Sequence, residues 1–112
     1  MHKTVLLQEA IDNLELEKGN IFVDGTLGAG GHTEEVCRRL GKAVKIIALD
    51  VDAEALERAK ERLAGTPCDI TYVEDNFRNL DAVMKDSGVQ HIDRILLDLG
   101  WSSDQFESSG RG

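Results

Sequence analysis

The sequence contains 112 residues, of which 41% are hydrophobic and 30% are charged, and its formal net charge is −8. This size predicts a single domain, residues 1–112, and the negative charge excludes a surface that grips a phosphate backbone by itself. Its apolar stretches are only a few residues long and no secretion signal precedes them, so we expect a cytoplasmic protein without a membrane partner.

The first expected element is an amphipathic helix at residues 5–14, within an N-terminal region of residues 1–19. Its apolar side chains recur at spacings that would let the helix cover one face of a sheet. These side chains are Leu6, Leu7, Ala10, Ile11 and Leu14.

Residues 20–100 alternate short apolar runs with helical patterns. The near-continuous apolarity of the runs is typical of strands buried on both faces of a parallel sheet. We predict strands at 21–24, 44–50, 70–73 and 94–99. We predict helices at 33–40, 53–64 and 80–87, the second with Asp52 as its N-cap and with a buried stripe of Ala55, Leu56, Ala59 and Leu63.

The resulting β-α-β-α-β-α-β order predicts an α/β fold with a doubly wound parallel sheet of about four strands in the order 3-2-1-4. Residues 101–112 have neither a helical nor a strand period and are expected to form a loop or tail.

Two cysteines, Cys37 and Cys68, have no spacing typical of a zinc site or of a disulfide framework. We therefore expect free thiols and no metal.

A glycine-rich segment, residues 24–32, joins the first strand to the next helix, as in nucleotide-binding folds. Its glycines allow close approach of a ligand, and the helix that follows offers free N–H groups to a carboxylate or phosphate. Gly28 and Gly30 are followed at once by Gly31, whereas position 33 is threonine and not the third glycine of dinucleotide enzymes. The pattern favours S-adenosylmethionine over NAD.

Asp50 ends the second predicted strand, twenty positions after Gly30. An acid there can accept hydrogen bonds from both hydroxyls of a ribose, the alternative being a strand-terminal acid that caps a loop.

Three further candidate residues lie at or after the ends of the third and fourth strands. Phe77 could form an apolar wall for an adenine or be a plain core residue. Asp98 ends the fourth strand, at the edge where open α/β sheets bind ligands, and could hold an amino group or orient an attacking amine. Gln105 could hydrogen-bond the cofactor or a base.

Together these segments resemble the ribosomal RNA small-subunit methyltransferase H (MraW) family. The resemblance is carried by His2-x-x-Val5-Leu6-Leu7-x-Glu9, residues 24–32, Asn76-Phe77, Asp98-Leu99-Gly100-x-Ser102-Ser103-x-Gln105 and Arg111-Gly112. It implies a Rossmann-like enzyme that uses S-adenosylmethionine to methylate N4 of a cytidine in small-subunit ribosomal RNA, with no metal for the transfer. The implied cofactor contacts are Gly30, Gly31, His32, Asp50, Phe77, Asp98 and Gln105, and Asp98 is the candidate catalytic residue.

The sequence departs from the family pattern at a few positions and in length. Val51 and Ala53 replace the usual arginine and proline after the ribose acid, Asp104 and Phe106 alter the segment around Gln105, and Trp101 replaces a small aliphatic residue. Family members continue beyond Arg111-Gly112, so we expect a truncated half-domain that binds cofactor and is weakly active or inactive on ribosomal RNA.

A sheet that ends at the fourth strand would expose an apolar edge, which predicts a homodimer through Ile95, Leu96 and Leu97. Two alternatives remain beside the methyltransferase interpretation. One is a non-catalytic fragment that self-associates through this edge, and the other is an NAD-binding oxidoreductase domain.

Overall fold

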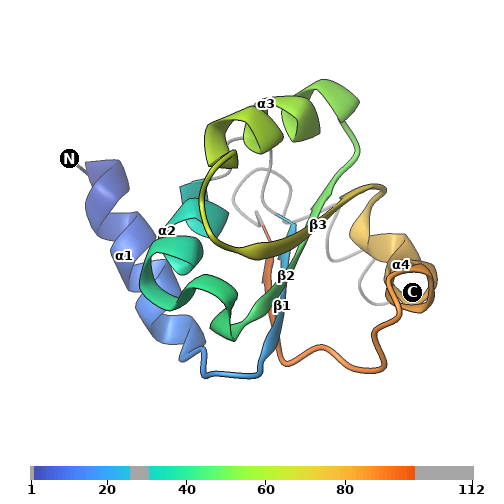
Figure 1. Ribbon diagram of the computed structural model, residues 1–112, viewed down its shortest axis with the longest axis horizontal. Coiled ribbons are helices and arrows are strands. Elements are labelled where there is room, and N and C mark those ends of the chain that lie inside the picture. The colour runs from blue at the N-terminus through green and yellow to red at the C-terminus, as the bar shows by residue number, and fades with distance from the viewer. Residues whose placement is uncertain (1, 26–30, 98–112) are drawn as a thin grey trace, which may run out of the picture.

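The computed structural model describes residues 2–25 and 31–97 as alternating helices and strands (Figure 1). Every helix and strand predicted from the sequence is present in this part of the chain, with ends that shift by three residues or fewer within it. The elements in chain order are α1 (His2–Leu14), β1 (Ile21–Gly25), α2 (Gly31–Leu40), η1 (Gly41–Ala43), β2 (Lys45–Asp50), α3 (Ala53–Leu63), β3 (Asp69–Glu74), η2 (Phe77–Asn79), α4 (Leu80–Asp86) and β4 (Arg94–Leu97).

The four strands form one parallel sheet in the order β3-β2-β1-β4, which confirms the predicted topology. In the register, Val23 of β1 lies between Ile47 of β2 and Ile95 of β4. The two central strands are buried on both faces, because alternate side chains of a strand point to opposite sides and both sides are covered.

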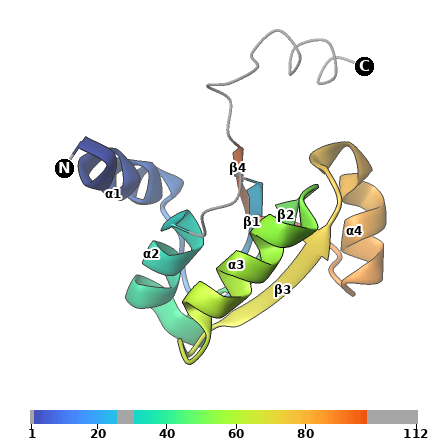
Figure 2. The ribbon, with the colours of Figure 1, turned by 90° about the horizontal axis from the view of Figure 1, so that it is seen from above.

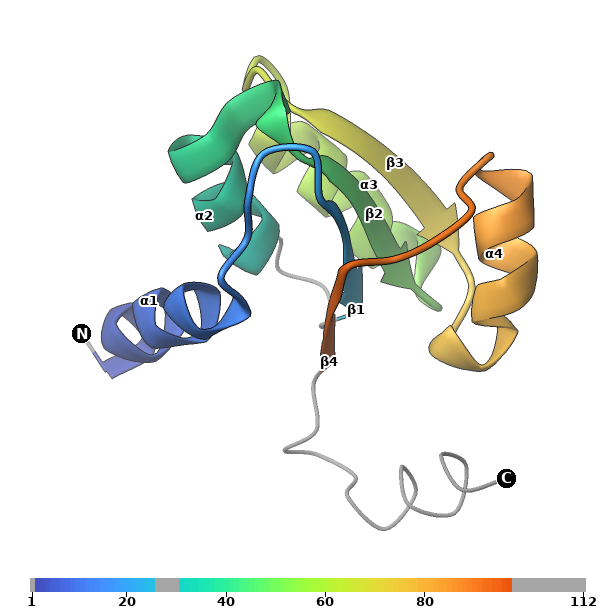
Figure 3. The same cartoon turned by 90° about the horizontal axis from the view of Figure 1, so that it is seen from below.

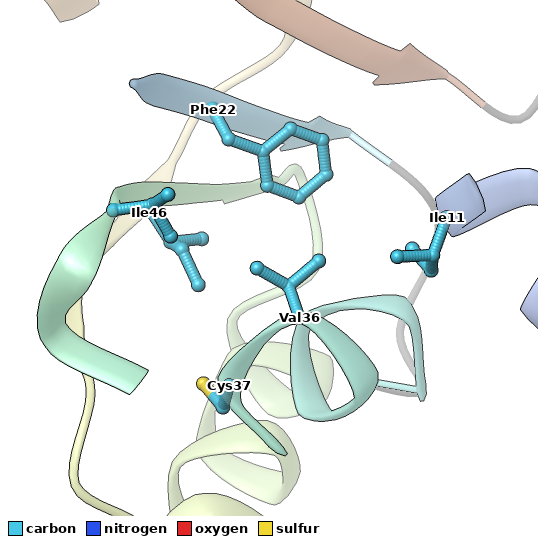
Figure 4. Packing of buried hydrophobic residues seen from close by; sticks show 6 residues of the cluster. Ile11, Phe22, Val36, Cys37 and Ile46 are labelled. Atoms are coloured by element: carbon cyan, nitrogen blue, oxygen red, sulfur yellow. The ribbon is translucent and has the colours of Figure 1, made fainter. Parts of the chain in front are cut away.

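One face of the sheet is covered by α1, α2 and α3, and the other by α4 (Figure 2). On the first face, Phe22 and Ile46 point from the strands toward Val36 of α2, and Ile11 reaches the same cluster from α1 (Figure 4). On the second face, Val23 and the other cluster members pack together: Ile47, Leu49, Val83 and Val89. The chain thus builds two apolar layers around one sheet, as the doubly wound fold requires.

Helix α3 begins and packs as its sequence predicts. The side chain of Asp52 accepts a hydrogen bond from the backbone N–H of Glu54 at 2.9 Å and so caps the first turn. The predicted stripe is buried: Ala55, Leu56, Ala59 and Leu63. Gly65 follows the helix with a φ of +86°, a conformation that favours glycine.

The expectation of free thiols is wrong. Cys37 of α2 and Cys68, just before β3, form a disulfide, and their Cα atoms lie 5.6 Å apart. The two residues are separated by 31 positions, but two successive β-α-β crossovers bring the end of α2 beside the start of β3. Sequence spacing could not reveal this contact, because it arises only from the packing of the helix on the sheet.

Strand β4 forms one edge of the described sheet, since β1 is its partner there. Ile95 is 42% exposed, whereas Leu96 and Leu97 are partly buried. Across residues 2–25 and 31–97, no helix is long and apolar enough to cross a membrane.

Candidate functional site

The carboxyl ends of the parallel strands meet at one edge of the sheet (Figure 3). Asp24 lies one residue before the end of β1, and Asp50 and Glu74 are the last residues of β2 and β3. Asp50 and Glu74 are register partners, and Asp24 pairs with Ala48, two positions before Asp50. Ligands of open α/β sheets bind at this edge, so the acids there define the candidate site.

Asp50 is the acid predicted to hold a ribose, and only 5% of it is exposed. Its Oδ1 accepts a hydrogen bond from the backbone N–H of Asp52 at 2.9 Å, and its carbonyl oxygen accepts one from Asp75 at 2.9 Å. The first bond is the loop-capping contact that the sequence left as the alternative role. It also fixes the carboxylate at the edge of the sheet, where a ligand would lie.

Asp24 and Thr33 form a buried polar pair at this edge, a contact that the sequence did not predict. Asp24 is 4% exposed and Thr33 is 1% exposed. The Thr33 hydroxyl donates to Asp24 Oδ2 at 2.5 Å and thereby joins β1 to the first turn of α2. The available signal was an acid inside an apolar strand followed by a hydroxyl residue at the start of the next helix.

A small cavity connects the two acids. Asp24, Thr33 and Asp50 line it together with α3 side chains and Tyr72, whose pKa is raised by burial. Its volume of about 20 Å³ has room for about one water molecule. A nucleotide-sized ligand would therefore lie outside this cavity, at the edge of the sheet.

The first turn of α2 contains two predicted contacts, Gly31 and His32, and both are partly buried. The N–H groups of a first helical turn have no partners within the helix, and together with the helix dipole they favour a negatively charged group. Asp24 and Thr33 hold this turn beside the end of β1. The geometry thus brings a helix N-terminus to the edge that carries Asp50.

An ionic network fixes the other end of α2. Glu35 is 5% exposed and accepts hydrogen bonds from Arg38 and from Arg39, the latter at 2.7 Å. The hydrogen bond from Arg39 is the main reason that the pKa of Glu35 is lowered. Arg39 also donates to Asp12 at 2.6 Å and to Gln8 at 2.5 Å, so it ties α1 to α2.

The segment just after β3 also lies at the carboxyl ends of the strands. The Asp75 carboxylate accepts hydrogen bonds from the Asn79 side chain at 2.6 Å and from the Asn76 backbone at 2.8 Å, and these bonds lower its pKa. Phe77 begins η2 and is partly buried against the apolar cluster on the α4 face. Phe77 therefore makes the core contact that was one of its two expected roles. It lies two residues after Asp75, whose backbone N–H donates to the carbonyl oxygen of Asp50.

Four of the seven predicted cofactor contacts lie in the described residues: Gly31, His32, Asp50 and Phe77. They come from α2, β2 and η2, elements that all begin or end at the carboxyl edge. Gly30, Asp98 and Gln105 lie outside the described residues. Within residues 2–25 and 31–97, no group of three or more His, Cys, Asp or Glu residues could hold a metal ion.

Known proteins are similar to this chain over nearly its whole length. Ribosomal RNA small subunit methyltransferase H of Lachnospira eligens is 43% identical over 111 residues, which cover 99% of this chain and 35% of the relative. The proteins of the same name from Brevibacillus brevis and Clostridium botulinum are 41% and 40% identical, with 99% of this chain and 35% and 36% of the relative covered. The chain thus spans about a third of the length of these relatives.

A solved structure supports the fold. A crystal structure described as an rRNA-methylase from Clostridium thermocellum matches with a TM-score of 0.57 and 18% identity, over 68% of this chain and 43% of that one. The shared architecture is the Rossmann-like α/β fold. The profile of the MraW methylase family matches residues 1–112, the whole of the sequence. The chain belongs to the MraW methylase family.

Proposed function

We propose that this chain binds S-adenosylmethionine at the carboxyl edge of its sheet and forms the cofactor-binding part of a methyltransferase. The observation that carries the proposal is the position of Asp50, a 5% exposed carboxylate at the end of β2 on the edge where α2 begins. A ribose-binding acid and an anion-binding helix N-terminus at one sheet edge are the two elements that nucleoside recognition needs in this fold.

Each side of the cofactor has a chemically matched group. Asp50 accepts hydrogen bonds from the ribose hydroxyls, and the N–H groups around Gly31 and His32 receive the carboxylate of the methionine part. Phe77 offers an apolar surface near the adenine. Gly30, Asp98 and Gln105 complete the set by family resemblance. When bound, the cofactor supplies an activated methyl group, and the chain binds and orients it.

The names of the relatives suggest the methyl acceptor. They are small-subunit ribosomal RNA methyltransferases, and we propose N4 of a cytidine in that RNA as the target of the full-length enzyme, with Asp98 near the reacting amine. We propose that the protein acts in the cytoplasm, where such a substrate lies. The net charge of −8 gives this chain alone little affinity for RNA, so we expect it to bind cofactor and to methylate RNA weakly or not at all.

Calorimetric titration with S-adenosylhomocysteine tests the proposal, with NAD as the competing ligand class. The Asp50→Ala variant should bind more weakly by about 1 to 3 kcal/mol, the cost of leaving ribose hydroxyls without their acceptor. Asp69→Ala is the matched control. Asp69 is the first residue of β3, at the amino ends of the strands. Its side chain is exposed, and its Oδ1 lies 3.7 Å from Nζ of Lys45.

Saturable binding that Asp50→Ala weakens and Asp69→Ala leaves intact supports the proposal. A folded wild-type chain that binds no adenosyl ligand would contradict it and favour the alternative of a non-catalytic fragment. Preference for NAD would favour the oxidoreductase alternative.

We also propose that two copies pair through β4, because Ile95 on this strand is 42% exposed and β1 is its partner within the described sheet. Edge strands offer unpaired backbone groups to a second strand. Sedimentation equilibrium should detect a dimer that Ile95→Lys weakens. A monomeric wild-type chain at high concentration would refute this pairing.

A further inference from the structure

The buried pair of Asp24 and Thr33 has a geometry that links the sheet directly to the candidate site. Asp24 sits inside β1, opposite Ala48 of β2 and Leu96 of β4. Its immediate predecessors, Phe22 and Val23, are fully buried apolar residues. A carboxylate in such a position is costly unless it is hydrogen-bonded, and Thr33 provides a bond at 2.5 Å.

This bond joins the first turn of α2 to β1, whereas the Cys37–Cys68 disulfide and the polar contacts of Glu34 and Arg39 join α2 to other parts of the chain. Thr33 is the third residue of α2, and the apolar contacts of that helix come from Val36 and Cys37, one turn further along. Apolar packing is not directional, whereas a hydrogen bond to a carboxylate fixes distance and angle. The pair therefore adds a directional contact between the first turn of α2 and the end of β1.

The Leu97 side chain of β4 packs over the end of β1 beside the pair. A Cβ added at Gly25, the residue after Asp24, would lie 2.8 Å from Leu97 Cδ2. Asp24 and Thr33 share a cavity of about 20 Å³ with Asp50. The pair thus lies directly beneath the edge that carries the ribose acid.

We propose that Asp24 is a positioning residue, whose hydrogen bond from Thr33 holds the first turn of α2 at the carboxyl edge and thereby sets the affinity for an adenosyl ligand. The second half of this inference rests on the proposed function. Asp24 acts through Thr33 and α2, and no contact between Asp24 and the ligand is needed.

The test compares Thr33→Val, which keeps the shape of the side chain and removes the hydroxyl, with Thr33→Ser, which keeps the hydroxyl. Val83→Ala is the matched control for a general loss of stability, because Val83 is 2% exposed and packs on the opposite face of the sheet. Binding of S-adenosylhomocysteine is measured by calorimetry at a temperature where circular dichroism shows all variants folded. Amide hydrogen exchange of the ligand-free chain is measured in parallel.

We expect Thr33→Val to weaken binding about tenfold, as for the loss of one charge-assisted hydrogen bond. It should also speed exchange at Glu35 and Val36, whose N–H groups donate within the first turns of α2 by helical geometry. Thr33→Ser should restore both, and Val83→Ala should lower stability while leaving affinity and this local exchange unchanged.

Unchanged affinity and exchange in Thr33→Val would overturn the inference. A loss of affinity in Thr33→Val would also overturn the inference if Val83→Ala, at the same free energy of unfolding, lost as much affinity. Thr33 would then have a merely structural role. If the wild-type chain binds no adenosyl ligand, the proposed function fails and the affinity half fails with it. Amide hydrogen exchange at the start of α2 would then test by itself whether the Thr33–Asp24 bond positions the helix.

Discussion

Replacing Glu35 by glutamine should destabilise the chain in a pH-dependent way. The Glu35 side chain is 5% exposed and accepts hydrogen bonds from Arg38 and Arg39. Arg38 is 67% exposed, so its bond contributes little, whereas Arg39 is 30% exposed and also holds Asp12. Glutamine keeps the volume but turns an amide N–H₂ toward a guanidinium. We expect the free energy of unfolding to fall by about 2 kcal/mol at pH 7, because the charged hydrogen bond from Arg39 is lost.

The sign of the pH dependence follows from the lowered pKa of Glu35, whose ordinary value is 4.5. A carboxyl with a lower pKa in the folded state stabilises the fold fully above its unfolded-state pKa, and this stabilisation is lost as the pH falls through the folded-state pKa. The glutamine variant has no such group. The stability gap between wild type and Glu35→Gln should therefore be widest near neutral pH and shrink in acid.

Urea unfolding followed by far-ultraviolet circular dichroism, at neutral pH and in acid, measures this gap. Glu57→Gln is the control, because Glu57 is 68% exposed and pairs with Lys60 across 3.4 Å on the surface of α3. Its effect should be small at every pH. A Glu35→Gln gap that stays the same in acid would refute the reasoning, and so would a Glu57→Gln effect of equal size.

Two further predictions concern stability. Asp52→Ala removes the side-chain cap of α3 and should lower the free energy of unfolding by about 1 kcal/mol in thermal or urea unfolding, while Asp52→Asn, which can still cap, should restore most of it. Reducing the Cys37–Cys68 disulfide should lower the free energy of unfolding by about 3 to 4 kcal/mol from the loop closure of 31 residues. Thiol titration and urea unfolding with and without reductant check this, and equal stability in both conditions would contradict it.

The sheet could be predicted from the sequence because its strands carry their own signal. Val23 and Ile47 belong to short apolar runs, and both are fully buried in the sheet. Strands that alternate with helices permit few topologies, and right-handed crossovers select the observed order. The cap at Asp52 was equally predictable, since capping depends on residues only two positions apart.

The contacts that the sequence did not reveal are those between residues far apart in the chain. Cys37 and Cys68 meet only after α2 packs on the sheet, and Arg39 reaches Asp12 across 27 positions. The Thr33–Asp24 bond spans nine residues and depends on the position of α2 relative to β1. Such contacts follow from the fold and have no local pattern, and this is why the Asp24–Thr33 pair of the site had to come from the structure.

An adenosyl ligand is expected to bind at the carboxyl edge of this sheet. The most direct test is ¹H–¹⁵N NMR of the labelled chain during titration with S-adenosylhomocysteine. We predict shifts of the amide signals concentrated at Gly31 and His32, at the end of β2 around Asp50, and at Asp75 to Phe77. The amino ends of the strands, such as Lys45 and Asp69, should stay unchanged. Shifts concentrated at those amino ends, or none at saturating ligand, would contradict the claim.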